Sequence, residues 1–257
     1  MKKTPPPASP PYTREVMHAL LLEHVTGQAC SHIVAVGRLK RIPGLKHTGK
    51  DNYAWLFKGE AIFCLASGPS LTAEICQRVR GRRSIAINSS AVLAPWASVL
   101  FFTDSGWYEP RRQLVANWDG LVISMSQTAK REMPDKVKRV QGEGDPQALP
   151  GFSRGPHVIQ QGRSSRHTAV SLAIALGATR VVLLGYDMRI VADREHCHDE
   201  KGSARDSEIY QREFVPGFAG WDEAARAVGV EVINATEGSA LKQFRFASLN
   251  DILRSAA

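Results

Sequence analysis

Residues 61–71, AIFCLASGPSL, decide the fold of this chain. An apolar run of strand length ends at Ser67-Gly68-Pro69-Ser70, and the following residues resume with helical spacing. This order predicts a strand, a tight turn and the start of a helix. In an open parallel sheet such a turn lies where ligands bind, and the free N–H groups of the next helix attract an anion. The turn is therefore either a phosphate-binding turn or an ordinary connection, since Gly-Pro-Ser is far less specific than a Walker loop.

Strand-like runs alternate with helical patterns through the rest of the chain, which predicts an α/β fold. Several runs, such as IFCLA, VLFF and VVLLG, are apolar without interruption, as is typical of strands buried on both faces. We therefore predict a Rossmann-like, mostly parallel sheet with helices on both faces, and a surface loop in the Gly- and Pro-rich segment 134–156. The predicted strands are 61–66, 84–88, 98–103, 120–124, 157–160, 179–185 and 230–234, and the clearest predicted helices are 165–176 and 221–228.

The 257 residues suffice for a single α/β domain with an extension. Residues 1–50 are rich in proline and basic side chains and are predicted to be an N-terminal extension, which leaves residues 51–257 as the globular domain. A net charge of +8 favours phosphorylated or polyanionic partners, nucleic acid included, although a solvated basic surface would explain it too. Four cysteines without CxxC spacing and no visible secretory signal predict a reducing, cytoplasmic setting. No apolar run is long enough for a membrane span.

Polar side chains follow several predicted strands. Asn88, Asp104, Asp187 and Asn234 each lie where a strand is expected to end, and such ends share one crevice in a doubly wound sheet. Asn88 could contact a base or ribose edge, or simply close a turn. The two aspartates could contact a hydroxyl or hold Mg²⁺, or each could cap the next helix. We expect the turn at Gly68 and these strand ends to converge on a single groove.

Two further segments carry candidate chemistry. Ser164, Ser165 and Arg166 come directly before or within the start of the best predicted helix, so they predict a second anion site, unless a serine only caps the helix. His196 and His198 lie in a polar loop after Asp187. A histidine there could act as a general base near neutral pH or bind a metal, although most surface histidines do neither.

The ordered set of motifs resembles the sialyltransferase-like and MptE-like Rossmann family. The resemblance covers about residues 61–253 and rests on GPSL, the strand ending in Asn88, Thr103-Asp104, the SS turn before AVSLAIALG, VLLGYDM, the histidine loop and VINAT followed by GSAL. It implies that the Gly68 turn, Asn88 and Ser164 or Ser165 contact a nucleotide donor. It also implies that His196 or His198 is the general base.

The resemblance is incomplete in two respects. The sialyltransferases place a pair of tyrosines on the donor phosphate, and this chain has no clear counterpart, because only Tyr186 and Tyr210 are near. Asp104 instead resembles the aspartate of the MptE-like branch, where a nucleotide is bound together with magnesium.

Residues 51–257 are therefore interpreted as a nucleotide-dependent transferase domain. The leading hypothesis is an inverting glycosyltransferase that takes a nucleotide-sugar donor, CMP-linked in the sialyltransferases, and a glycan or other hydroxyl acceptor. One alternative is a pyrophosphokinase in which Asp104 and Asp187 hold Mg²⁺, and another is a non-catalytic nucleic-acid-binding or assembly protein. The candidate catalytic residues are His196, His198 and Asp187, and the candidate nucleotide-binding residues are Ser67, Gly68, Pro69, Ser70, Asn88, Asp104, Ser164, Ser165, Arg166 and Asn234.

Overall fold

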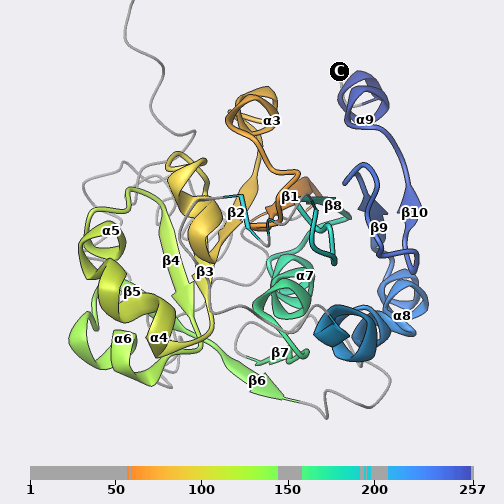
Figure 1. The fold of residues 1–257 in the computed structure, drawn as a ribbon. Coiled ribbons are helices and arrows are strands. Elements are labelled where there is room, and N and C mark those ends of the chain that lie inside the picture. The colour runs from red at the N-terminus through yellow and green to blue at the C-terminus, as the bar shows by residue number, and fades with distance from the viewer. Residues whose placement is uncertain are drawn as a thin grey trace, which may run out of the picture.

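The centre of the protein is an eight-stranded sheet in which every neighbouring pair of strands is parallel (Figure 1). The computed structural model describes residues 57, 59–143, 158–191, 194, 196–197 and 208–255, so the predicted extension 1–50 lies outside it. The strand order is β10-β9-β8-β1-β2-β3-β4-β5. The strands of this sheet are β1 (Ala61–Leu65), β2 (Ser84–Ile87), β3 (Val99–Phe102), β4 (Leu121–Ser124), β5 (Val137–Arg139), β8 (Arg180–Leu184), β9 (Glu231–Asn234) and β10 (Arg245–Phe246).

The order in which strands join the sheet changes direction at β1. Strands β2 to β5 are added in sequence order on one side of β1, and β8 to β10 are added on the other side. In register, Phe63 of β1 lies between Ser84 of β2 and Val182 of β8. The predicted parallel α/β sheet is thus confirmed, and its topological switch point lies between β1 and β8. In doubly wound sheets ligands bind outside the carboxyl ends of the strands near this point.

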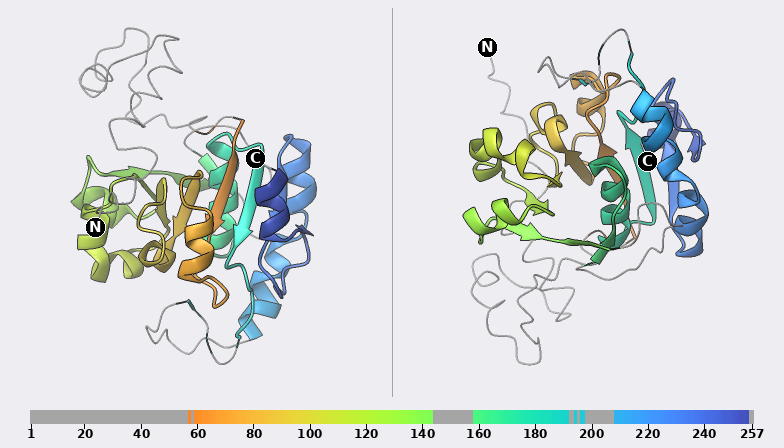
Figure 2. Two further views of the ribbon diagram at one scale, coloured as in Figure 1. Left: turned by 90° about the horizontal axis from the view of Figure 1, so that it is seen from above. Right: turned by 60° about the horizontal axis from the view of Figure 1, so that its bottom comes forward.

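Helices cover both faces of the sheet. In Figure 1, α3 and α9 lie on one side of the strands while α7 and α8 lie on the other, and Figure 2 shows the same arrangement from two other directions. Successive residues of β1 alternate between the two cores, since Ile62 and Cys64 pack on the α7 side and Phe63 and Leu65 pack on the α3 side. The helices are α3 (Ala73–Arg78), α4 (Ser105–Tyr108), α5 (Arg112–Ala116), α6 (Gln127–Glu132), α7 (Ser165–Ala175), α8 (Trp221–Ala227) and α9 (Leu249–Ser255), with single turns η1 (Asn88–Val92), η2 (Glu109–Arg111), η3 (Tyr210–Phe214) and η4 (Pro216–Phe218).

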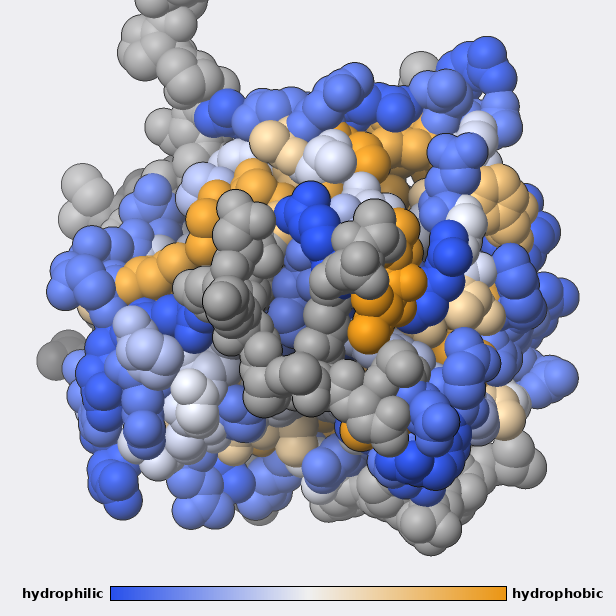
Figure 3. Space-filling model, viewed as in Figure 1, coloured by the Kyte–Doolittle hydropathy of each residue, from blue (hydrophilic) through white to orange (hydrophobic). Residues whose placement is uncertain are grey.

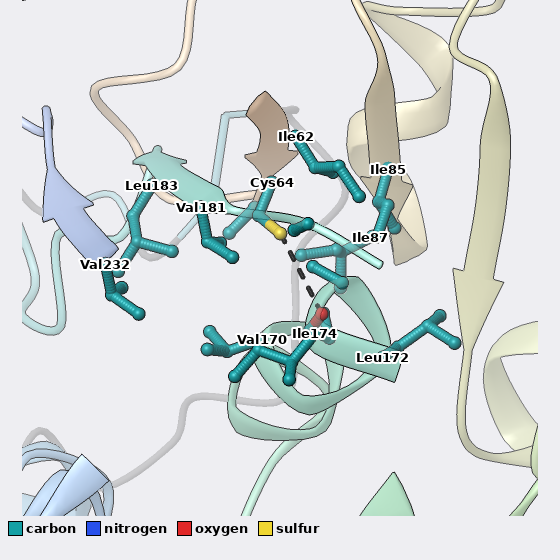
Figure 4. Packing of buried hydrophobic residues seen from close by; sticks show 14 of the residues in the cluster. Ile62, Cys64, Ile85, Ile87, Val170, Leu172, Ile174, Val181, Leu183 and Val232 are labelled. Carbon is teal, nitrogen blue, oxygen red and sulfur yellow. Dashed lines mark hydrogen bonds between the residues drawn. The ribbon is translucent and has the colours of Figure 1, made fainter. Parts of the chain in front are cut away.

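Helix α7 is buried along its whole length of 11 residues. It packs beneath β1, β2 and β8, and the thiol of Cys64 points at the carbonyl oxygen of Ala169 at 3.8 Å (Figure 4). The sequence predicted a helix at 165–176 but not that it would be buried all round. The structure surrounds the helix because η3, η4 and α8 cover its other side, so its polar residues Arg166 and His167 are buried as well.

One part of the predicted fold was wrong, and one predicted strand lies in a sheet of its own with an unexpected partner. The segment expected to be a loop contains β5 and β6 (Gln141–Glu143). The strand predicted at 157–160 exists as β7 (Val158–Gln160), but it pairs with β6 in a separate two-stranded sheet. These strands are only three residues long, too short for a periodic pattern.

The described surface is mostly polar. The face in Figure 3 is largely hydrophilic at its edges, and hydrophobic residues gather nearer its middle. No helix within the described part of the chain combines the length and the apolar character that a membrane crossing requires.

Candidate functional site

A cavity of about 630 Å³ lies at the carboxyl ends of β1, β2 and β3 and at the N-terminus of α7. It brings together only some of the strand ends that were expected to share one groove, and most of its wall is polar. The predicted site residues in its wall are Ser67, Asn88, Asp104, Ser164, Ser165, Arg166 and His196. The other lining residues are Ile87, Ser89, Thr103, Trp107, Arg111, Arg163, Ile209, Glu213 and Phe214.

Asp187 holds the turn after β1, and Ser67 is the one residue of the turn 67–70 that lines the cavity. The hydroxyl of Ser70 donates to Oδ2 of Asp187 at 2.9 Å, and the Ser70 N–H donates to the same carboxylate at 3.2 Å. Gly68 packs so closely that a Cβ there would collide with Asp187 Oδ2 and with the carbonyl oxygen of Gly185. Gly68, Pro69, Ser70 and Asp187 are absent from the cavity wall. Glycine is therefore required at residue 68 for packing against the end of β8.

Asp187 is a buried carboxylate with a structural partner. Its side chain is 3% exposed. Burial raises the pKa of this carboxyl, and the hydrogen bonds from Ser70 oppose the rise. The hydrogen bonds with Ser70 give Asp187 a structural role in holding the turn after β1. Its candidate catalytic role stays a prediction.

The ends of β2 and β3 meet α7 through a chain of polar contacts. Asn88 Nδ2 donates to Ser165 Oγ at 3.3 Å, and Ser165 Oγ lies 2.6 Å from Thr103 Oγ1. Asn88 has a left-handed backbone with φ of 53°, a conformation that asparagine tolerates better than most residues. Its buried Oδ1 accepts no hydrogen bond from the part of the chain that is described. Asn88 therefore both shapes the turn and lines the cavity, while its Oδ1 is a buried acceptor without a partner among the described residues.

Asp104 both caps a helix and lines the cavity, the two positions that the sequence allowed for it. Its carboxylate caps α4 by accepting from the Trp107 N–H at 2.8 Å, and it lines the cavity. Arg111 lies with its guanidinium 5.3 Å from the centre of the Trp107 ring. Burial lowers the pKa of Arg111, while the charge of Asp104 opposes that shift. This arginine is thus electrostatically matched by an acidic neighbour.

The first turn of α7 presents a buried positive charge to the cavity. Arg166 is 8% exposed, and no described carboxylate lies within ion-pair distance of it. The side chain of Ser164, the N-cap of α7, makes no hydrogen bond to a backbone N–H of the first turn. The first N–H groups of a helix have no partner within the helix, so they remain available to an anion beside Arg166. By contrast, Arg163 lies 3.6 Å from the carboxylate of Glu213.

Ser164 is instead joined to a buried histidine. Its Oγ lies 2.9 Å from Nδ1 of His167, and Nε2 of His167 lies 3.0 Å from the carbonyl oxygen of Phe214. His167 is fully buried and stacks on Phe218 with ring centres 3.7 Å apart. Burial lowers the pKa of this imidazole to about 3, and the Phe214 carbonyl opposes the shift. The ring is therefore neutral near pH 7.

His196 lies in the wall of the cavity and is half-buried. The next residue anchors it, because the N–H of Cys197 donates to the carbonyl oxygen of Ser67 at 2.9 Å. This contact holds the histidine loop against the end of β1. The other predicted base, His198, lies outside the described residues.

The predicted site residue Asn234 and the two tyrosines near the site in sequence lie away from the cavity. Asn234 is 2% exposed and closes its own turn, since Nδ2 donates to the Leu241 carbonyl at 2.9 Å and Oδ1 accepts from the Thr236 N–H at 3.0 Å. Tyr186 and Tyr210 are both buried, and the Tyr186 hydroxyl donates to the carbonyl oxygen of Arg166. Neither tyrosine lines the cavity, so neither is placed to contact a phosphate there.

The expected magnesium pair is not brought together in one wall. Asp104 lines the cavity, whereas Asp187 holds the turn after β1. Among the described side chains, no three His, Cys, Asp or Glu residues form a cluster that could bind a metal. The basic segment around Arg78 and Arg83 contributes no residue to the cavity, and Arg83 pairs with Glu60 at 2.8 Å.

Several lining residues had no assigned role in the sequence-based site. Thr103 directly precedes Asp104, and Trp107 and Arg111 follow it at helical spacing, so the end of β3 could have predicted them. Glu213 and Phe214 carried no comparable signal. They reach the cavity because η3 packs beside the N-terminus of α7.

Comparisons with known proteins give little beyond this geometry. No protein-family model matches the chain, and no curated protein sequence matches it. Among solved structures, the chain is similar to the sialyltransferase CstII from Campylobacter jejuni, solved in complex with a substrate analogue, CMP-3FNeuAc. The identity is 12% and the TM-score 0.44, over 74% of this chain and 87% of that chain. A likeness this remote carries no conclusion about chemistry, and the expected relation to MptE-like proteins stays a prediction.

Proposed function

We propose that this protein is a nucleotide-dependent transferase, specifically an inverting glycosyltransferase that binds a nucleotide-sugar donor in the cavity above β1, β2 and β3. The observation that carries the proposal is Arg166, a charged side chain that is 8% exposed and has no described carboxylate at ion-pair distance. It lies at the N-terminus of α7 in the wall of a polar cavity.

A buried arginine that makes no ion pair is costly, because the charge loses much of its hydration, and the charge of Asp187 lies beyond ion-pair distance. A bound anion offsets that cost. The N-terminus of α7 adds partial positive charge and free N–H groups at the same place. Because the cavity also has the size of a small-molecule site, the anion is best interpreted as the phosphate of a larger ligand.

The polar groups beside the anion site suit a nucleoside. Asn88 brings an amide group, and Ser165 and Thr103 bring hydroxyl groups, within one hydrogen-bonded chain in the cavity wall. An amide and two hydroxyls can match the mixed donors and acceptors of a base or ribose edge. Nucleotide binding thus accounts for both the charge and the polarity of the wall.

His196 supplies the general base in this proposal. The acceptor hydroxyl would attack the anomeric carbon of the donor while the bond from that carbon to the phosphate oxygen breaks. The hydroxyl proton passes to the imidazole, and the electron pair of the broken bond leaves with the nucleotide phosphate. Arg166 and the N-terminus of α7 would stabilise the negative charge that grows on this leaving group.

A ligand screen tests the proposal. Thermal shift and calorimetric titration with CMP, UDP, GDP and ATP, with and without Mg²⁺, identify the donor class. Arg166→Gln should weaken the binding of the best nucleotide by about 10- to 100-fold, the usual value of a charge-assisted hydrogen bond. Arg226→Gln is the matched control, because Arg226 lies on α8 in an exposed ion pair with Asp222. The proposal fails if no nucleotide binds or if both variants behave alike.

The same screen separates the transferase from the alternatives. His196→Asn should abolish turnover while leaving nucleotide affinity within about threefold of the wild type, since the base acts on the acceptor. Binding of ATP that strictly requires Mg²⁺ would favour the pyrophosphokinase instead. Salt-sensitive binding of DNA or RNA that is unaffected by Arg166→Gln would favour the nucleic-acid-binding protein.

A further inference from the structure

We propose that Ser164 is a fixed hydrogen-bond acceptor in the cavity, oriented by His167, and that it selects a nucleotide carrying a ribose hydroxyl or base amine at that point. The inference rests on the proposed function for the identity of the ligand, but the hydrogen-bond polarity of Ser164 follows from the geometry alone. It replaces the expectation that Ser164 contacts a phosphate.

The Phe214 carbonyl oxygen, which contacts Nε2 of His167, sets the direction of the hydrogen bond between His167 and Ser164. Nε2 of His167 lies 3.0 Å from the carbonyl oxygen of Phe214, which has no proton to give. Nε2 must therefore carry the proton and donate it. In a neutral imidazole the other nitrogen is then an acceptor, so Nδ1 accepts the proton of the Ser164 hydroxyl 2.9 Å away.

Neighbouring residues enclose the imidazole closely. A Cβ at Gly162 would collide with the Cβ of His167, and a Cβ at Gly217 would lie 2.8 Å from its Nε2. Phe218 stacks on the ring, and the Trp221 ring meets it edge-on with centres 5.6 Å apart. This enclosure fixes the plane of the ring, and within that plane the contacts with Ser164 and Phe214 select the orientation that places both nitrogens on partners.

The consequence for Ser164 is that only lone pairs face the cavity. Its proton points into the protein, and its hydroxyl caps no N–H of the first turn of α7. A phosphate oxygen is an acceptor and would be repelled there, whereas a hydroxyl or amine of the ligand would be bound. Arg166 lies two residues further along the chain and has the opposite preference. Its guanidinium group carries only N–H donors, so it binds hydrogen-bond acceptors such as phosphate oxygens. Ser164 thus marks a part of the cavity that binds hydrogen-bond donors of the ligand, and Arg166 marks a part that binds an anion.

The first experiment measures the tautomer without any ligand. Nitrogen-15 shifts of the His167 ring, assigned by comparison with His167→Phe, should report a protonated Nε2 and an unprotonated Nδ1. They should remain so from about pH 5 to about pH 8, because the folded pKa lies far below this range. Ser164→Ala should move the Nδ1 resonance alone. A protonated Nδ1 or titration within this range would overturn the proposal.

The second experiment measures selectivity. The best-bound nucleotide is compared with its 2′-deoxy form, its 3′-deoxy form and the form with a methylated exocyclic amine. The wild type should bind one of these analogues about 3- to 10-fold more weakly, as expected for one neutral hydrogen bond. Ser164→Ala should bind that analogue and the parent equally. Arg166→Gln should weaken both while keeping the ratio between them.

The outcomes keep the two proposals apart. If the wild type binds no nucleotide, the proposed function is wrong, and the nitrogen-15 spectrum still decides the polarity of Ser164. If nucleotides bind but Ser164→Ala preserves the selectivity, the role of Ser164 is wrong and the transferase proposal stands. His167→Phe, which releases the serine proton, should reduce the selectivity while leaving the Arg166→Gln effect unchanged.

Discussion

Replacing Gly68 by alanine should destabilise the protein by about 3 kcal/mol, the upper end of the usual cost of overpacking. A methyl group at this position would lie within 3.0 Å of Asp187 Oδ2 and of the Gly185 carbonyl oxygen. Neither atom can withdraw easily. Asp187 is buried and bound by Ser70, and the Gly185 carbonyl already accepts from the Gly68 N–H at 3.0 Å. The new methyl group must therefore push the turn away from β8.

Urea unfolding followed by circular dichroism measures this cost, and Gly106→Ala provides the control. Gly106 is also next to the cavity, in α4, but the nearest atom to its Cβ would be Asp104 Oδ1 at 3.7 Å, an ordinary contact. This variant should keep or raise stability by about 0.5 kcal/mol, because alanine loses less entropy than glycine in a helix. If Gly68→Ala unfolds within about 0.5 kcal/mol of the wild type, the packing of the turn against Asp187 is wrong.

Three further predictions follow from buried groups. His167 alone should lower the free energy of unfolding by about 2 kcal/mol between about pH 7 and pH 5. The reason is that the unfolded imidazole gains a proton below about pH 6.5, while the folded imidazole, with a pKa of about 3, does not. His167→Phe should flatten this part of the curve of stability against pH. In native protein near neutral pH, iodoacetamide should leave Cys64 and Cys76 unmodified, since burial raises both pKa values to about 12, and mass spectrometry of the peptides would detect any exception. Asn88→Gly should keep stability within about 1 kcal/mol, because glycine accepts its left-handed backbone, but should weaken nucleotide binding about 10-fold in calorimetry; unchanged affinity would remove Asn88 from the ligand site.

The sequence was sufficient for β1 to β4, β8 and β9 because these strands are buried on both faces. It did not predict β10, whose two residues are exposed. A run such as VLFF in β3 has no polar residue to interrupt it, so its existence and parallel pairing are readable without a partner. The three-residue strands β5 and β6 were missed for the opposite reason. Their residues are part-exposed or mixed, and pairing between β6 and β7 depends on contacts distant in sequence.

The site was predictable where residues follow strands and unpredictable where they meet through space. Asn88 and Asp104 were found from their position at the ends of β2 and β3. The partnership of Ser70 with Asp187 spans 117 residues, so sequence spacing could not show that these two would satisfy each other outside the cavity. The contact of His167 with Phe214 spans 47 residues and was equally hidden.

The charge in the cavity wall leads to a last prediction about the donor. Arg163 lies at ion-pair distance from Glu213, and Arg111 interacts with the charge of Asp104. Arg166 also lines the cavity and makes no ion pair with a described carboxylate, although it interacts electrostatically with Asp187. Together with about half a charge from the N-terminus of α7, it supplies about +1.5. This suits the phosphate of a nucleoside monophosphate, which grows from one negative charge to about two as it leaves, better than a diphosphate with about three.

Without added metal, CMP should therefore bind at least as tightly as CDP, and UMP at least as tightly as UDP. Calorimetry of each pair at low salt holds the base constant, so a difference within a pair reports the phosphate alone. Mg²⁺ should raise the affinity of the diphosphates more than that of the monophosphates, because it supplies the missing positive charge. Diphosphates that bind more than tenfold more tightly in EDTA would contradict this charge balance and would place a further cation in the site.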